Sequence, residues 1–268
     1  GFLGGMTGGG HGLGGMGGGG HAPTSIAWVT CAKYLPLTQK LAVGSFQRSI
    51  KIFDLASYEL YGQIPDVDDV PLAMDAWIPA RRRDVEFISI GDGGGHVRLF
   101  ELKQSAHESK KGSHDQFVDR CCWSYKHHLD WVTSICYVED MNCVVAGSLD
   151  RTISLTDIEE RVTVKKLTDH HTKGVTSIGW SSIYKFVASG GLDRKLILWN
   201  PFSQKPLAIL NGHNAAISQV IVNDRDNQVI SLSQDRNIKI WDIRNHKVVQ
   251  SITDKLPSNA AYGGGGGG

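Results

Sequence analysis

The 268-residue sequence has few of the features that build metal centres, disulfide frameworks or membrane spans. It has five cysteines, and no two of them stand at the C-x-x-C spacing of metal and redox sites: Cys31, Cys121, Cys122, Cys136 and Cys143. An odd number without a framework spacing fits a reducing compartment. No apolar run approaches the roughly 18 residues of a membrane-spanning helix. We therefore expect no metal ion, no structural disulfide and no membrane partner.

An excess of charge of one sign is also absent. Lys and Arg number 28 against 27 Asp and Glu, a formal net charge of +1. Such a balance gives no bulk electrostatic reason to bind nucleic acid or an anionic membrane. The apolar content of 41% is enough to fill the core of one large all-β domain.

Motifs of catalysis and cofactor binding are missing as well. No G-x-S-x-G nucleophile elbow occurs. The glycine run 91–95 would need a sixth glycine where His96 stands, and a hairpin turn explains it better than a phosphate loop. The run 66–69 begins like a calcium loop but lacks its glycine and closing glutamate, so we expect a turn. The sequence predicts no catalytic residue, no cofactor and no small-molecule substrate.

What the sequence does contain is a repeat, most complete between Gly212 and Asp242. Three Gly-His or His-His elements each precede an aspartate by 22 positions: His128 and Asp150, His171 and Asp193, His213 and Asp235. Positions 53, 100, 156, 199 and 241 share one phase, at intervals of 47, 56, 43 and 42 residues. Alternating apolar strands separated by Asp or Asn turns at this period predict an all-β propeller of about five four-stranded blades.

This punctuation resembles the WD-repeat (WD40) family. The resemblance implies a hydrogen-bonded relay in each blade, from Trp through a Ser or Thr hydroxyl and His to the turn Asp. Two copies are complete in the sequence: Trp199, Ser189, His171 and Asp193, then Trp241, Ser231, His213 and Asp235. A third keeps His128 and Asp150 but has Ala146 and Thr156, so we expect it to be broken. The first two blades lack the relay, and we expect packing and strand pairing alone to hold them.

A Ser-His-Asp set also invites a hydrolase interpretation. Recurrence once per blade, closed each time by Trp, favours a structural role instead. Trp offers only a donor and a carboxylate only acceptors, so a hydroxyl and an imidazole are natural intermediates between them. The neighbours His127 and His170 are expected in turns. An enzymatic propeller would need a convergent carboxylate pair or metal cluster, and the sequence names none.

The expected domain plan has three parts. Residues 1–22 form a glycine-rich flexible linker, residues 23–256 the blades (about 24–65, 70–125, 128–168, 171–211 and 213–253), and residues 257–268 a glycine-rich tail. Residues 103–115 form an exposed insertion. Since WD-repeat propellers usually close with seven blades, we expect these five to belong to a larger ring, seven-bladed or double, within a longer protein. The alternative is a closed ring of five blades, because each unit has its own four strands.

The resemblance also implies a partner-binding face. In the family, partners contact the residue before each turn Asp and the residue three after each His. Carried over, the candidates are Trp28, Phe46, Trp131, Leu149, Leu192 and Gln234. Exposed aromatic side chains among them would suit protein partners.

The second blade narrows the resemblance. Pro71-Leu72, Asp75 with Trp77, and the run 91–97 are similar to an atypical blade of ciliary WD-repeat proteins, some of which carry EF-hands. This implies a non-enzymatic scaffold in the axoneme of motile cilia, with axonemal protein partners. The alternative is a cytosolic adaptor that reads peptides or assembles a regulatory complex.

Overall fold

Five four-stranded antiparallel sheets make up the computed structural model, which describes residues 28–64, 67–103, 120–203 and 205–253. In each sheet the strands pair in sequence order, so every sheet is one up-and-down blade. The expected linker 1–22, most of the expected insertion and the expected tail 257–268 lie outside the described residues.

The strand bounds are as follows. The first blade has β1 (Val29–Leu35), β2 (Lys40–Ser45), β3 (Ser49–Asp54) and β4 (Leu60–Ile64). The second has β5 (Pro71–Trp77), β6 (Val85–Asp92), β7 (His96–Lys103) and β8 (Arg120–Lys126). The third has β9 (Val132–Val138), the 3-10 helix η1 (Glu139–Met141), β10 (Cys143–Ser148), β11 (Ile153–Asp157) and β12 (Thr163–Leu167). The fourth has β13 (Val175–Ser181), β14 (Phe186–Gly191), β15 (Leu196–Trp199) and β16 (Pro206–Leu210). The fifth has β17 (Ile217–Asn223), β18 (Gln228–Ser233), β19 (Asn237–Asp242) and β20 (Lys247–Thr253).

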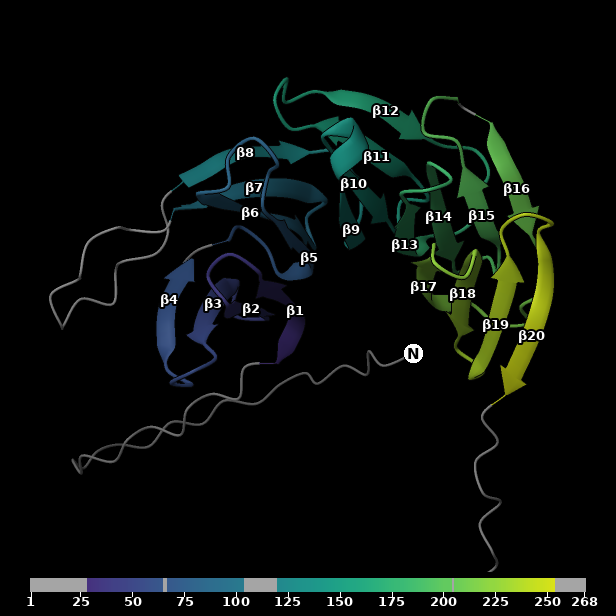
Figure 1. Ribbon diagram of the computed structural model, residues 1–268, viewed down its shortest axis with the longest axis horizontal. Coiled ribbons are helices and arrows are strands. Elements are labelled where there is room, and N and C mark those ends of the chain that lie inside the picture. Colours follow the sequence, from purple (N-terminus) through teal and green to yellow (C-terminus); the bar gives the residue numbers. More distant parts are fainter. Residues whose placement is uncertain (1–27, 65–66, 104–119, 204, 254–268) are drawn as a thin grey trace, which may run out of the picture.

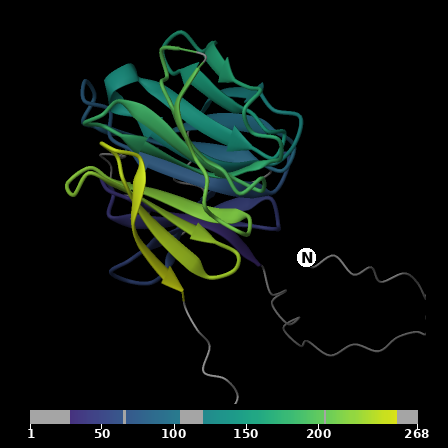
Figure 2. The same ribbon diagram turned by 90° about the vertical axis from the view of Figure 1, so that its right-hand side faces the viewer.

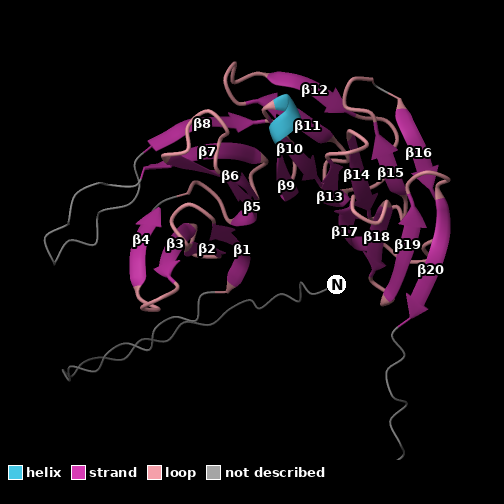
Figure 3. Cartoon of the chain, in the orientation of Figure 1, coloured by secondary structure: helices cyan, strands magenta, loops and turns pink. Residues whose placement is uncertain are grey.

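The blades follow one another around an open arc (Figure 1). The first strand of each blade lies on the inside of the arc and the fourth on the outside, as the labelled strands of Figures 1 and 3 show. Figure 2 looks towards the outer edge of the fifth blade, where β20 lies nearest the viewer. Within the described ranges the only helix is η1, whose three residues are far too few to cross a membrane.

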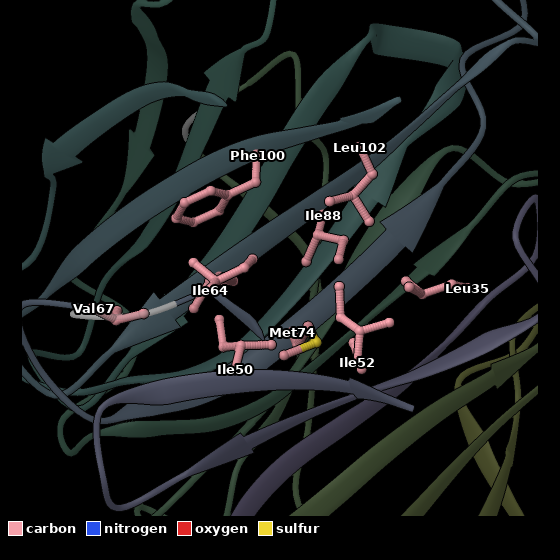
Figure 4. Close-up of a cluster of buried hydrophobic side chains, with 11 residues drawn as sticks. Leu35, Ile50, Ile52, Ile64, Val67, Met74, Ile88, Phe100 and Leu102 are labelled. Atoms are coloured by element: carbon pink, nitrogen blue, oxygen red, sulfur yellow. The ribbon is translucent and has the colours of Figure 1, made fainter. Parts of the chain in front are cut away.

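Apolar side chains fill each junction between consecutive blades. The cluster between the first and second blades contains Ile50, Ile52, Met74 and Ile88, all almost completely buried (Figure 4). Further clusters lie between the second and third, third and fourth, and fourth and fifth blades. Because both faces of the inner blades are covered, their middle strands are buried along nearly their whole length, as in β10 and β14.

A threonine hydrogen bond repeats across three of these junctions. The second residue of the inner strand donates its hydroxyl to a carbonyl on the next blade's inner strand: Thr30 to Pro71, Thr133 to Val175 (2.8 Å) and Thr176 to Ile217 (2.6 Å). A serine adds a second link, since Ser134 Oγ accepts from Ile178 N and Ser177 Oγ from Val220 N. The second blade has Leu72 at the threonine position, and there Asp75 Oδ2 accepts from Tyr137 N at 2.7 Å.

Candidate functional site

The fourth blade brings all four of its expected relay residues together. Trp199 Nε1 donates to Ser189 Oγ (2.7 Å), Ser189 Oγ lies 2.8 Å from His171 Nε2, and His171 Nδ1 lies 3.1 Å from Asp193. A carboxylate can only accept, so Nδ1 carries the proton and Nε2 accepts from the serine. Burial raises the pKa of the Asp193 carboxyl, but hydrogen bonds from His171 and from two backbone amides outweigh burial and hold this pKa below its ordinary value.

The geometry of this relay excludes attack by its serine on a substrate. Ser189 is completely buried, and its oxygen is already shared between the indole N–H and the imidazole. A nucleophile must reach its substrate, whereas Ser189 and its neighbour His171 are both buried within the blade. Among the described residues, no group of three or more His, Cys, Asp or Glu side chains is arranged to hold a metal ion.

The fifth blade corrects the expectation of a second complete relay. Trp241 Nε1 donates to Ser231 Oγ (2.8 Å), and that oxygen lies 2.6 Å from His213 Nε2. Asp235, however, accepts from the hydroxyl of Ser233 and the amide of Asn237. His213 Nδ1 is buried without a hydrogen-bond partner in the part of the chain that the structure describes. Burial, together with nearby Lys239, lowers the pKa of His213.

In the third blade a serine on a different strand takes the place of the missing relay hydroxyl, which corrects the expectation of a broken relay. Ala146 has no hydroxyl, but Ser154 faces it across the β10–β11 ladder and places its Oγ 2.9 Å from His128 Nε2. On the other side of the ring, His128 Nδ1 lies 3.1 Å from Asp150. Burial raises the pKa of Asp150, but its hydrogen bonds with His128, Thr152 and the Leu129 amide more than offset this and hold the pKa well below the ordinary range.

His127 follows β8 directly, outside the strands, and its ring makes two hydrogen bonds that the sequence did not predict. Its Nε2 lies 3.4 Å from the hydroxyl of Thr156, and its Nδ1 lies 2.8 Å from that of Thr163. Burial, with the neighbouring His128 and Lys166, lowers the pKa of His127 to about 4. His127 therefore connects the loop after β8 to Thr156, which stands where the later blades have Trp, and to Thr163 of β12.

The second blade has a buried ion pair instead of a relay, so packing and strand pairing are not its only support. Asp92 is fully buried and accepts from Arg98, whose other terminal nitrogen donates to Asp68 at 2.7 Å. The amides of Gly94 and His96 each donate to Asp92 Oδ1 at 2.9 Å. These bonds connect the β6–β7 hairpin to the loop between β4 and β5, which contains Asp68. The sequence pattern did not predict these bonds, because an Asp and an Arg stabilise this hairpin in place of the His, Ser and Trp of the relay.

The six candidate partner-binding residues share one backbone arrangement. In each of four blades, a backbone hydrogen bond joins the turn between the second and third strands to the residue directly before the first strand. The amide donor is the residue before the turn Asp, or before Gln47 in the first blade. The pairs are Phe46 to Trp28 (3.0 Å), Leu149 to Trp131 (2.9 Å), Leu192 to Gly174 (2.8 Å) and Gln234 to Ala216 (2.9 Å). All six therefore lie at the same end of their blades. We call this end the loop face.

Exposure differs among these residues. Trp28 is 73% exposed, Phe46 60% and Trp131 48%, while Leu149 and Leu192 are half-buried and Gln234 is exposed. Leu149 is covered in part because it packs against Gly174 of the next blade, where an added Cβ would come within 2.7 Å of its side chain. Leu129, 87% exposed and two residues before Trp131, extends the apolar surface. The family positions did not include it, although an apolar residue directly after the His was visible in the sequence.

Comparison with known proteins agrees with the blade pattern. A model of the family "WD domain, G-beta repeat" matches residues 119–157, 161–200 and 204–242. Each match starts at or near the outer strand of one blade and ends with the third strand of the next, so the sequence repeat is offset by one strand from the structural blade. The chain therefore contains WD40 repeats.

Three similar proteins have matching segments of different lengths. A Drosophila virilis "WD repeat-containing protein on Y chromosome" is 38% identical over 58 residues, 21% of this chain and 5% of that protein. A Tetrahymena thermophila "Cilia- and flagella-associated protein 337 B" is 23% identical over 170 residues, 63% of this chain and 12% of that protein. A Dictyostelium discoideum "WD repeat domain-containing protein 83 homolog" is 27% identical over 112 residues, 41% of this chain and 34% of that protein. The matches thus cover only a small part of the first two relatives.

Proposed function

We propose that this WD40-repeat chain is a non-enzymatic scaffold that holds partner proteins on its loop face. WD40 repeats are generally protein-interaction scaffolds without catalytic activity. The observation that carries the proposal is the exposure of Trp28, Phe46 and Trp131 at the same end of their blades. Large aromatic side chains held on a rigid frame supply much of the binding energy of protein interfaces, because little conformational entropy is lost on binding.

We further propose that the scaffold works in the axoneme of motile cilia. Two observations support this: the atypical second blade, with its Asp75 and Trp77, and the match over 63% of this chain to a Tetrahymena protein named for cilia and flagella. The partners would be axonemal proteins. Neither nucleic acid nor a membrane is expected, because the formal net charge is only +1.

Fractionation of cilia tests the axonemal role. The tagged full-length protein would be expressed in a ciliated cell, and isolated cilia would be separated into detergent-soluble material and salt-extracted axonemes. We expect the tag to remain with the salt-extracted axonemes. Recovery only from the cell body would contradict the axonemal role and favour a cytosolic adaptor, which would leave the interaction scaffold itself in place.

A further inference from the structure

A cavity of about 670 Å³ lies between the second and third blades, away from the loop face. Its walls come from the β5–β6 loop (79–82), the segment around η1 (139–142) and the β11–β12 turn (157–161). Since β9 begins beside Trp131 on the loop face and runs towards η1, the cavity lies at the opposite end of the blades. The two surfaces can be changed independently.

The floor of this cavity is apolar and rigid. Phe87, Leu99, Trp123 and Tyr137 line it. Tyr137 is stacked on Trp77 with ring centroids 4.2 Å apart and planes 9° apart, and Trp77 in turn contacts Phe87 at 5.8 Å. Aromatic rings fixed in this way present a surface with negative faces, which attracts cationic groups.

Trp123 contributes its indole ring to the cavity wall, but not its N–H. The residue is only 6% exposed, and its indole Nε1 is buried without a hydrogen-bond partner among the residues described. Indole can only donate, and an unpaired buried donor costs about 1–3 kcal/mol. Because Nε1 is shielded from solvent, a ligand in the cavity can contact the indole ring but cannot accept from its N–H.

The polar rim favours a cation. Five carboxylates line the cavity with three arginines. Arg82 is paired with Glu101 at 2.7 Å, Lys185 with Asp140 at 2.7 Å, and Arg81 lies 3.5 Å from Glu159. Among the described residues, the carboxylates of Glu139 and Asp157 have no ion-pair partner and supply the negative charge that is left for a ligand. Burial raises the pKa of Tyr137, and the nearby carboxylates of Glu139 and Glu159 raise it further, as expected where the local potential is negative.

We propose that this cavity binds an extended peptide segment of a partner protein through a Lys or Arg side chain that lies over the aromatic floor. The carboxylates of the rim complement the basic side chain. The site adds a second docking place to the proposed scaffold. It does not depend on the loop face, because it is built from the opposite ends of the strands.

A selection from random peptides tests this site. The full chain would be used to select from a phage-displayed library of random dodecapeptides, and the enriched peptides would be synthesised with fluorescein and titrated by fluorescence anisotropy. Two neighbouring glutamates provide a matched pair of variants. Glu159 lines the cavity and Glu160 does not, while Asp157 accepts both of their amides, at 2.8 and 2.9 Å.

We expect enriched peptides that combine a Lys or Arg with apolar residues. Glu159→Lys should weaken their binding roughly tenfold, because it places a cation beside the peptide's cation, and Glu160→Lys should leave binding nearly unchanged. Thermal melting would confirm that both lysine variants keep the fold.

Three results would overturn the cavity proposal: no enrichment, enrichment of acidic peptides, or equal weakening by the two lysine variants. Peptides that lose binding with Trp131→Asp but not with Glu159→Lys would also overturn it. That last pattern would leave the loop-face proposal intact, so the two failures can be told apart.

Discussion

The turn aspartates of the fourth and fifth blades differ in their contact with the blade's histidine. We expect this difference to change the free energy of unfolding. Asp193 accepts from His171, while Asp235 accepts from Ser233 and does not hydrogen-bond to His213. Asp193→Ala would leave the buried imidazole N–H without an acceptor, so we expect it to lower the free energy of unfolding by about 1–3 kcal/mol. Asp235→Ala is the matched control and should cost less than about 1 kcal/mol.

Urea denaturation followed by circular dichroism measures both variants. Equal losses would contradict the account, because they would show that the imidazole contact contributes nothing beyond the turn itself. Double substitution of either Asp with its His would then separate the turn contribution from the ring contribution.

His127 predicts a specific pH dependence. Its pKa is lowered from 6.5 to about 4, so its neutral form is favoured in the folded state. Below pH 6.5 the unfolded chain takes up a proton at this position that the folded chain does not bind. The stability that His127 contributes is therefore present above pH 6.5 and is lost as the pH falls towards 4.

The variant His127→Gln should flatten the fall in stability over this window. Melting temperatures measured at several pH values would show the change in slope, and His246→Gln, at an exposed turn, corrects for the loss of one histidine. A wild-type slope in His127→Gln would show that the ring is not kept neutral by its burial.

Sequence reasoning located the relay positions but not their contacts. Ser154 lies on a different strand from Ala146, and only the register of β10 against β11 brings the two side chains opposite each other. An alignment of repeats compares equivalent positions and cannot detect a replacement across the ladder. The Asp92–Arg98 pair was not predicted for a related reason. It stabilises a buried hairpin, as the relay does, but with residue types that the repeat pattern does not include.

At the scale of blades, the repeated threonine bond predicts a local coupling. Thr176 Oγ1 donates to Ile217 O of the fifth blade at 2.6 Å and to Gly190 O of its own blade at 3.0 Å. Ser218 is its equivalent in the fifth blade and donates to Leu232 O of its own blade at 3.1 Å. The two hydroxyls therefore differ in that only the threonine crosses a junction.

Thr176→Val should weaken the junction of the fourth and fifth blades by about 1–2 kcal/mol, because the shape is kept and the hydrogen bonds are lost. Native-state hydrogen exchange, compared with the unsubstituted protein, would detect a larger increase in exchange rate in β17 than in β13. Ser218→Ala is the control and should change exchange little. An equal effect of Thr176→Val and Ser218→Ala on exchange would contradict the coupling, because it would show that the threonine stabilises only its own blade.

The five four-stranded blades expected from the repeat are observed. Their strands are predictable because a strand with one face in the core has a period of two. Contacts between blades are less predictable, since the bonds of Thr133 and Thr176 to the next blade depend on side-chain placement rather than on pattern.

For the whole molecule, we propose that the five blades form part of a larger ring. The last apolar residue of the outer strand is buried in three blades with a following neighbour, as Ile64 (3%), Leu167 (1%) and Leu210 (6%). Its equivalent in the fifth blade, Ile252, is 42% exposed. In the first four blades, a glycine near the end of the second strand packs closely against the next blade; these are Gly44, Gly91, Gly147 and Gly190. The fifth blade has Leu232 at this position, so a sixth blade would have to pack against a larger side chain.

This proposal predicts uneven protection in the 268-residue chain. Amide exchange in β17–β20 should be faster than in β9–β16, because only one face of the fifth blade is covered. In a longer polypeptide that supplies further blades, the difference should disappear. Equal protection of all five blades, with one cooperative unfolding transition of residues 22–256, would contradict the larger ring.

The central claim is that the loop face holds the partner proteins, and quantitative affinity purification from ciliated cells tests it most directly. The full-length protein would be compared with Trp131→Asp, with Leu129→Asp and with a control, Tyr58→Asp. Tyr58 is 83% exposed, in the β3–β4 turn away from the loop face. Thermal melting of each variant would confirm that the fold is kept.

We predict that the proteins recovered with the wild type fall roughly tenfold or more with each loop-face variant, because burying a carboxylate in an apolar interface is strongly unfavourable. Recovery with Tyr58→Asp should be unchanged. Recovery of the same proteins in the same amounts with folded Trp131→Asp and Leu129→Asp would contradict the account and place the partner-binding surface elsewhere on the propeller.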